Sequence, residues 1–139
     1  MAVAGEVVGS IDAGLLILVG IEPMDTDDDV ATAVEKVAHL RVFPDDAGLM
    51  NRSLIETGGS ALVVSQFTLM GKLRKGRRPS FVGAADPETA RRLVERFTEG
   101  LEGAGVPTAA GVFGASMSVD LVNEGPVTII LEVRDGRVT

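Results

Sequence analysis

The feature that most constrains the fold is a continuous apolar run, Ala61-Leu62-Val63-Val64, inside the segment Ser60 to Thr68. A strand with one face in water alternates apolar and polar residues, whereas a strand covered on both faces is apolar throughout. We therefore predict that this segment is the central strand of a sheet with other elements packed on both of its faces.

Two further segments have the pattern of amphipathic helices. In Asp25 to Val42, apolar residues recur at helical spacing and acidic residues stand at the start, where they complement the positive end of the helix dipole. The second helix is predicted to begin at Asp86-Pro87-Glu88, a strong start signal, and to end at Gly103 and Gly105. Its apolar stripe consists of Ala90, Leu93, Val94, Phe97 and Leu101.

The remaining apolar segments have the composition of strands. Glu6 to Ile11 and Leu15 to Gly20 are predicted to form a hairpin around Asp12-Ala13-Gly14. Three closing antiparallel strands are expected over Pro107 to Phe113, Ser116 to Val122 and Val127 to Val133. This order requires a crossover connection, and it predicts an α/β fold with mixed β-sheets and two helices. A chain of 139 residues has the size of a single domain.

Two segments are expected to be irregular. Phe43 to Gly59 is rich in glycine and aspartate, and we predict little regular structure there beyond a short extended piece at Leu49 to Asn51. The polar tail from Val133 to Thr139 is predicted to be loosely held.

Composition excludes several classes of site. The chain has no cysteine and a single histidine, so a disulfide framework, a thiolate zinc site and a histidine-rich metal site are ruled out, and we expect no metal and no cofactor. That histidine, His39, is interpreted as a surface residue late in the first helix rather than as a catalytic base. We find no leader segment and no apolar run of the ~18 residues that a membrane span needs, so a cytoplasmic protein without a membrane is expected.

Positive charge is concentrated in one short segment although the net charge is -7. No acidic residue occurs from Ser65 through Ala85, and Gly76 and Pro79 indicate a loop. The basic residues of this loop are Lys72, Arg74, Lys75, Arg77 and Arg78. A solvated loop and a loop that contacts phosphate groups are both compatible with the pattern.

Two short motifs have both a structural and a functional interpretation. Gly125-Pro126 is compatible with a plain turn, but glycine also lets the main chain approach a ligand or a second subunit closely. Ser65-Gln66-Phe67-Thr68-Leu69 is either a polar strand end or a binding segment, because strand ends hold free amides and hydroxyls rigidly.

Taken together, these motifs resemble the D-aminoacyl-tRNA deacylase family. The similarity runs in order from about Gly5 to Leu131. The segments that carry it are Ser65-Gln66-Phe67-Thr68-Leu69, Arg74-Lys75-Gly76-Arg77-Arg78-Pro79-Ser80-Phe81, Phe113-Gly114-Ala115-Ser116-Met117 and Asn123-Glu124-Gly125-Pro126-Val127-Thr128.

The resemblance implies a homodimeric enzyme that hydrolyses D-aminoacyl-tRNA, and glycine attached in error to tRNA(Ala), with its active site at the subunit interface. The fold implied is a three-layer α/β/β arrangement. Relatives usually start with one more strand, which carries an arginine. We expect that strand to be missing here, and a start codon assigned downstream of the true one is our interpretation.

The resemblance also assigns roles to residues. The amides of Phe67 and Thr68 would stabilise the developing oxyanion. A cis Gly125-Pro126 peptide would enter the partner's pocket, where its carbonyls would exclude an L-amino acid. Ser65 and Gln66 would shape the pocket, and Phe113 and Met117 would line it near the terminal adenosine. The basic loop would bind tRNA.

Several alternatives stay open. Thr68 could act as a nucleophile, although no base is visible in the sequence to activate it. The chain could instead remove a wrong L-amino acid, as similar domains of archaeal threonyl-tRNA synthetases do. It could also bind the tRNA end without hydrolysing anything.

Overall fold

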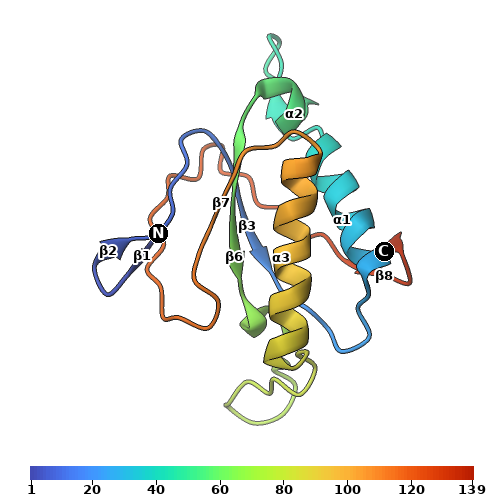
Figure 1. The fold of residues 1–139 in the computed structure, drawn as a ribbon. Coiled ribbons are helices and arrows are strands. Elements are labelled where there is room, and N and C mark those ends of the chain that lie inside the picture. The colour runs from blue at the N-terminus through green and yellow to red at the C-terminus, as the bar shows by residue number, and fades with distance from the viewer.

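Figure 1 shows the computed structural model of the protein, which describes all residues from Met1 to Thr139. Two long helices cover one face of a three-stranded sheet, and loops and short hairpins surround this centre. In chain order the elements are β1 (Ala2–Val3), β2 (Glu6–Val7), β3 (Gly14–Val19), α1 (Asp27–His39), β4 (Phe43–Pro44), β5 (Met50–Arg52), α2 (Leu54–Thr57), β6 (Ser60–Ser65), the 3-10 helix η1 (Phe67–Met70), α3 (Pro87–Gly103), β7 (Thr108–Ala110), β8 (Val133–Arg134) and β9 (Arg137–Val138). None of the helices combines the length and the apolar character that a membrane crossing needs.

The central sheet is parallel, and its strand order is β3-β6-β7. Leu62 of β6 pairs with Leu16 of β3 on one side and with Ala109 of β7 on the other. The prediction that the apolar run forms the central strand is confirmed, since Ala61 to Val64 are all buried. Parallel strands need crossover connections, and α1 and α3 supply them.

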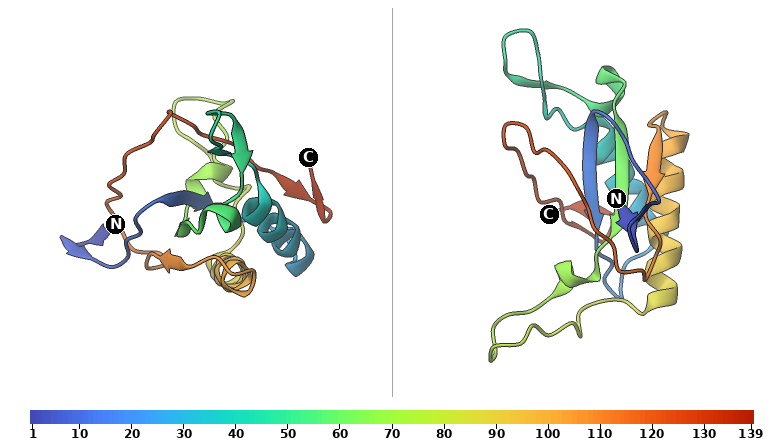
Figure 2. Two further views of the ribbon diagram at one scale, coloured as in Figure 1. Left: turned by 90° about the horizontal axis from the view of Figure 1, so that it is seen from above. Right: turned by 90° about the vertical axis from the view of Figure 1, so that its left-hand side faces the viewer.

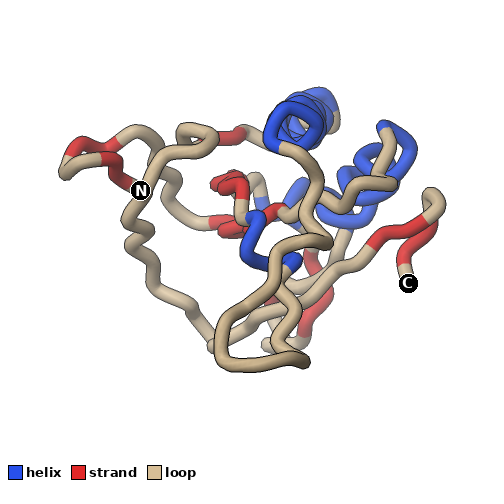
Figure 3. The backbone as a smooth tube through the Cα atoms, turned by 90° about the horizontal axis from the view of Figure 1, so that it is seen from below, coloured by secondary structure: helices blue, strands red, loops and turns tan.

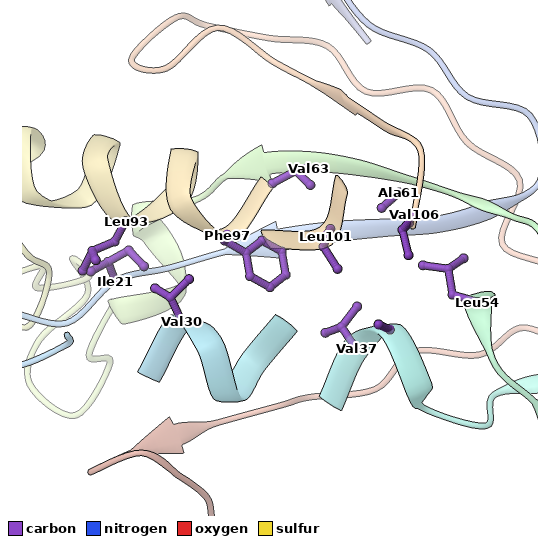
Figure 4. Packing of buried hydrophobic residues seen from close by; sticks show 11 residues of the cluster. Ile21, Val30, Val37, Leu54, Ala61, Val63, Leu93, Phe97, Leu101 and Val106 are labelled. Atoms are coloured by element: carbon purple, nitrogen blue, oxygen red, sulfur yellow. The ribbon is translucent and has the colours of Figure 1, made fainter. Parts of the chain in front are cut away.

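Alternate residues of β6 enter two different cores because successive side chains of a strand point to opposite faces. Leu62 and Val64 pack with Met1 on the face away from the helices. Figure 4 shows the larger core, which lies between the sheet and the two helices. Its buried members are Ile21, Val30, Val37, Ala38, Leu54, Ala61, Val63, Leu93, Phe97, Leu101 and Val106.

Both predicted helices are confirmed. Helix α1 (Asp27–His39) is shorter at each end than the predicted segment Asp25 to Val42. Helix α1 begins after Thr26, which forms a capping box with Asp29. Helix α3 begins as predicted: the Asp86 carboxylate accepts a hydrogen bond of 3.0 Å from the amide of Thr89. The predicted stripe of α3 faces the core, and Leu93 and Leu101 are fully buried in it.

The predicted hairpin of Glu6 to Ile11 with Leu15 to Gly20 is wrong. Strand β3 instead runs parallel to β6, and Glu6–Val7 pairs with Ala2–Val3. The reason lies at Gly14, where a Cβ atom would stand 1.8 Å from the carbonyl oxygen of Ser60. The glycine was interpreted as part of a turn, but it permits the close approach of β6.

The prediction of three closing antiparallel strands is also wrong. Only a short β7 forms within the first of them, and it is parallel to β6. The chain from β7 to β8 is otherwise loop, as Figure 3 shows, with one bridge between Ser118 and Ala2. We call residues 116–132 the excursion. Its alternating residues have the composition of strands, but within one chain Ser118 alone pairs with a strand, and residues 119–131 form no main-chain to main-chain hydrogen bond.

The segment predicted to be irregular contains more structure than expected. Strands β4 and β5 form a small hairpin, and β5 covers most of the extended piece that was predicted. The single turn α2 follows, with Ser53 as its N-cap and Glu56 completing a capping box. The molecule therefore has a third, short helix in addition to the two that were predicted.

The C-terminal tail is not loosely held. Strands β8 and β9 form a hairpin around Asp135 and Gly136, which both have positive φ, as two-residue hairpin turns require. Gly136 docks the hairpin on α1: its amide donates to the Asp29 carboxylate over 2.8 Å, and its carbonyl accepts from the Thr32 hydroxyl over 2.9 Å. The Asp-Gly pair was the sequence signal for this turn.

Asp29 is expected to contribute stability that disappears in acid. The hydrogen bond from the Gly136 amide, with further ones from Thr26, holds the pKa of this buried carboxyl below its ordinary value against the opposing effect of burial. A lowered folded-state pKa stabilises the protein above the unfolded pKa of about 3.9, and the contribution is lost as the pH falls through the folded-state pKa.

Replacing Asp29 by asparagine should therefore lower the free energy of unfolding by about 2 kcal/mol at pH 7. Urea unfolding at pH 7 and pH 3 measures this, and the difference between parent and variant should shrink at pH 3. Asp28→Asn, in the same turn but exposed, is the control. An equal effect of the two substitutions would contradict the role of Asp29 in docking the hairpin.

Candidate active site

The end of β6 presents main-chain amides without partners. After Ser65 the chain enters η1, whose first two residues are Phe67 and Thr68. The first amides of a helical turn have no acceptor within the turn, and neither of these two finds one elsewhere in the chain. Both residues are exposed. The arrangement can therefore donate two adjacent hydrogen bonds to an external oxygen atom.

The side chains of this turn contain no base. The Gln66 side-chain amide donates to the hydroxyl of Thr68, so this hydroxyl is held in place by a neutral group. His39 is exposed near the end of α1, and its Nε2 lies 3.6 Å from Oε1 of Glu35, one turn earlier on the same helix. The interpretation of His39 as a surface residue is confirmed. No group of histidine, aspartate and glutamate side chains is arranged to hold a metal ion.

A cavity of about 230 Å³ lies between β6, α3 and the segment after β7. Ser65 and Phe113, both predicted site residues, line it together with Val63 and Gly111. The remaining wall is α3, whose contributing residues are Arg91, Val94, Glu95, Thr98 and Glu99. Sequence reasoning missed this wall. The spacing of four residues between Arg91, Glu95 and Glu99 was a signal that all three share one face of the helix.

Met117, also predicted for the site, does not line this cavity. It packs with Met1 beside Leu62 and Val64, on the face of β6 away from the helices. A Cβ atom on Gly111 would lie 2.6 Å from the Met117 sulfur. The chain therefore crosses closely beside Met117 after β7 and brings Phe113, but not Met117, to the cavity.

The basic loop begins at the turn that presents the free amides. Its base is closed by two hydrogen bonds, of 2.8 and 2.9 Å, between the main chains of Lys72 and Ser80. The ring of Phe81 meets that of Phe67 edge to face at 5.1 Å between centroids, which ties the end of the loop to η1. All five basic residues of the loop are exposed and none forms an ion pair. Their charge is available to a ligand at this end of the molecule.

The Gly125-Pro126 peptide is cis, as the resemblance implied. Both residues are exposed, and the turn around them is held by the Asn123 side chain, which accepts from the amide of Val127 and donates to the hydroxyl of Thr128. In the right-hand view of Figure 2 the excursion turns back in the upper part of the molecule, whereas η1 lies in the lower part. One chain alone does not bring the two motifs together.

The carboxyl groups with shifted pKa values lie outside this region. Burial raises the pKa of Asp25, and hydrogen bonds lower those of Asp29, Asp45 and Asp86. These shifts arise in turns and helix caps. The turn at the end of β6 therefore offers main-chain amides as donors and contains none of these shifted carboxyl groups.

The fold and this strand-end site define a mixed α/β domain of the deacylase type. A solved structure titled "c-Myc DNA Unwinding Element Binding Protein" matches 96% of this chain and 91% of its own with a TM-score of 0.90 and 38% identity. A second, titled as a probable eukaryotic D-amino acid tRNA deacylase, matches the fold with a TM-score of 0.65 at 22% identity, over 75% of this chain and 76% of its own.

Sequence relatives make the assignment specific. The D-aminoacyl-tRNA deacylase of Thermus aquaticus is 56% identical over 132 residues, which are 95% of this chain and 87% of that protein. The protein of the same name from Thermomicrobium roseum is 58% identical over 135 residues, 95% of this chain and 86% of its own. The model of the D-Tyr-tRNA(Tyr) deacylase family matches residues 1–132. The chain belongs to this family.

Proposed function

We propose that this protein hydrolyses the ester bond between a D-amino acid and the 3′-terminal adenosine of tRNA. Glycine attached in error to tRNA(Ala) is a further substrate, and L-aminoacyl-tRNA is rejected. The observation that carries the proposal is the pair of free amides at Phe67 and Thr68, beside a cavity in a chain of this family. Residues 1–139 act as one three-layer α/β/β domain in the cytoplasm, where aminoacyl-tRNA is used.

The two amides stabilise the negative charge that develops on the ester carbonyl oxygen when water attacks the carbonyl carbon. The bond from that carbon to the ribose 3′-oxygen then breaks, and the 3′-oxygen takes up a proton to leave a free D-amino acid and tRNA. Donors aimed at such an oxyanion are worth about 3 kcal/mol each in known hydrolases. The 2′-hydroxyl of the tRNA assists the attacking water, and no cofactor enters this scheme.

Other side chains of the site position the substrate. Ser65, whose hydroxyl has no partner in the chain, and Gln66 shape the pocket at the end of β6. Phe113 contacts the terminal adenosine from the cavity. The assignment of Met117 to the adenosine stays a prediction that the single chain does not support directly, since its side chain lies on the other face of β6.

Replacing Thr68 by alanine should leave the deacylation rate within about threefold of the parent, because the amide rather than the hydroxyl is used. Single-turnover hydrolysis of a D-aminoacyl-tRNA measures this. Thr68→Ser is the matched variant, since serine keeps a hydroxyl. Loss of turnover in the alanine variant with retention in the serine variant would show that Thr68 is a nucleophile.

We propose that the excursion is a dimer interface. It exposes four large apolar side chains, Leu121, Val122, Ile129 and Ile130, of which Val122 and Ile130 are 87% and 86% exposed. From residue 119 to residue 131 the only hydrogen bonds are those made by the Asn123 side chain. An exposed apolar segment with free strand-type main-chain groups is a surface that a second chain covers.

A two-fold dimer also explains how Gly125-Pro126 reaches an active site. The excursion turns at one end of the molecule and η1 lies at the other (Figure 2). A two-fold axis perpendicular to the strands brings the end of one protomer that carries the excursion against the end of its partner that carries η1. The main chain of Gly125-Pro126 then borders the partner's pocket and excludes the side chain of an L-amino acid by steric contact.

The basic loop binds the acceptor stem of the tRNA. In the right-hand view of Figure 2 the loop extends from η1 at the lower end of the molecule. Its five basic residues, Lys72, Arg74, Lys75, Arg77 and Arg78, are all exposed. Charge contacts with phosphates make binding strongly dependent on salt.

The proposed activity is tested by incubating the purified protein with D-tyrosyl-tRNA and measuring release of D-tyrosine. Catalytic release is expected. Binding of tRNA with steep salt dependence but without release would favour a tRNA-end binding protein instead.

A further inference from the structure

The α3 wall of the cavity carries three charged side chains that form no ion pair or hydrogen bond within the chain. Arg91, Glu95 and Glu99 follow one another at single-turn spacing along α3, and all three line the cavity. None of them forms an ion pair or a hydrogen bond within the chain. On the same helix Arg92 pairs with Asp27 over 3.1 Å, so its charge is satisfied. The cavity therefore contains one free cation and two free carboxylates.

Arg91 is held away from its helical neighbour. An arginine and a glutamate four residues apart on a helix can pair, but the Arg91 guanidinium lies over the ring of Phe113, 5.3 Å from the ring centroid. This position leaves the N–H groups at the edge of the guanidinium free and leaves the carboxylate of Glu95 without its nearest cation. Phe113, Arg91 and Glu95 thus offer an aromatic face, a cation and an acceptor in one cavity.

We propose that this wall binds the cytidine that precedes the terminal adenosine of tRNA, and that it selects cytidine over uridine. The inference rests on the proposed function, which brings the 3′ end of tRNA to Ser65 and Phe113 in the same cavity. Arg91 binds the phosphate that joins the two last nucleotides. Glu95 accepts a hydrogen bond from the exocyclic amine of cytosine.

The chemistry of the wall favours cytosine. Carboxylates accept from the N4 amine of cytosine, whereas uracil presents a carbonyl oxygen at that position, which a carboxylate repels. A purine is larger and would have to fit the same space. Every mature tRNA ends in cytidine, cytidine and adenosine, so the wall reads a feature that all tRNA substrates share and other RNA ends lack.

The inference is tested by binding of an uncharged RNA hairpin that carries the acceptor-stem end, so that the measurement does not depend on hydrolysis. One hairpin ends in cytidine, cytidine, adenosine, and the other has uridine in place of the second cytidine. The intact protein should bind the first about tenfold more tightly. Glu95→Gln should abolish most of this preference, since an amide can pair with either base.

Two controls separate the wall from general charge effects. Glu102→Gln removes a carboxylate on the same helix outside the cavity and should keep the preference. Arg91→Gln should weaken binding of both hairpins and reduce the dependence of log Kd on log salt by about one. Arg92→Gln removes the same charge from a residue that already pairs with Asp27, and it should change the salt dependence less.

Equal binding of the two hairpins by the parent protein would overturn the inference, as would binding of neither, or a preference that survives Glu95→Gln. The proposed function fails separately: an intact cytidine preference without hydrolysis of D-tyrosyl-tRNA would refute the activity and leave this subsite in place.

Discussion

Replacing Ile130 by aspartate is expected to separate the proposed dimer and to lower deacylation about 100-fold while each protomer stays folded. Ile130 is 86% exposed in the single chain, so the substitution removes no protomer core contact. At a dimer interface the new carboxylate would be buried without a partner, at a cost of several kcal/mol. That cost weakens association by about two orders of magnitude or more. Activity should fall because, in the proposed arrangement, the pocket then lacks the partner's Gly125-Pro126.

Sedimentation equilibrium and single-turnover hydrolysis on the same samples measure the two effects. Met24→Asp is a matched control, because Met24 is also 86% exposed but lies on the loop before α1. It should leave both association and rate unchanged. An Ile130→Asp protein that remains an active dimer would show that the excursion is not the interface.

Replacing Gly125 by valine is expected to lower hydrolysis of D-aminoacyl-tRNA about 100-fold, the effect of displacing a group at a pocket by about 1 Å. Gly125 has φ +121, and a Cβ atom there would lie 2.7 Å from Cγ2 of Val127 and 3.1 Å from the amide nitrogen of Val127. The main chain of the turn must shift to relieve this contact. Because both residues of the motif are exposed, the shift should act on the proposed contact with the partner's pocket more than on the protomer's own stability.

Gly105→Val provides the comparison for Gly125→Val. Gly105 also has positive φ, +94, but a Cβ atom there would meet nothing within 4 Å, and the residue follows α3 away from the excursion. Both variants should lose about 1–2 kcal/mol from backbone strain. Only Gly125→Val should lose activity. Equal rates for the two variants would mean that the turn plays no part in catalysis or selection.

The elements that sequence analysis predicted correctly are those whose determinants are local. The Ala61 to Val64 run identified the central strand, and the Asp86-Pro87-Glu88 start identified α3, because capping and apolar periodicity act within one element. Strand pairing is not local. The hairpin prediction for Leu15 to Gly20 failed because the true partner, β6, lies about 45 residues further along the chain.

The prediction of strands in the excursion failed for a related reason. Its residues alternate as those of strands do, but from residue 119 to residue 131 the single chain offers no neighbouring strand, and no main-chain to main-chain hydrogen bond forms. The C-terminal hairpin was missed although Asp135-Gly136 signals a tight turn, because its polar flanks suggested a solvated tail.

Part of the candidate site was foreseeable and part was not. Ser65 and Phe113 line one cavity, whereas Met117, which the resemblance grouped with Phe113, lies on the other face of β6. The basic loop follows η1 directly. The α3 wall with Arg91 and Glu95 was not foreseen, since charges at helical spacing are usually solvated and nothing in the sequence placed this face against a cavity.

The most direct test of the central claim, that main-chain atoms select the substrate by handedness, is the rate of hydrolysis of D-tyrosyl-tRNA beside that of L-tyrosyl-tRNA. The two substrates share every atom type and differ only in configuration at one carbon. We predict rapid release of D-tyrosine and no release of L-tyrosine above the spontaneous rate. Comparable rates for the two enantiomers would contradict the account.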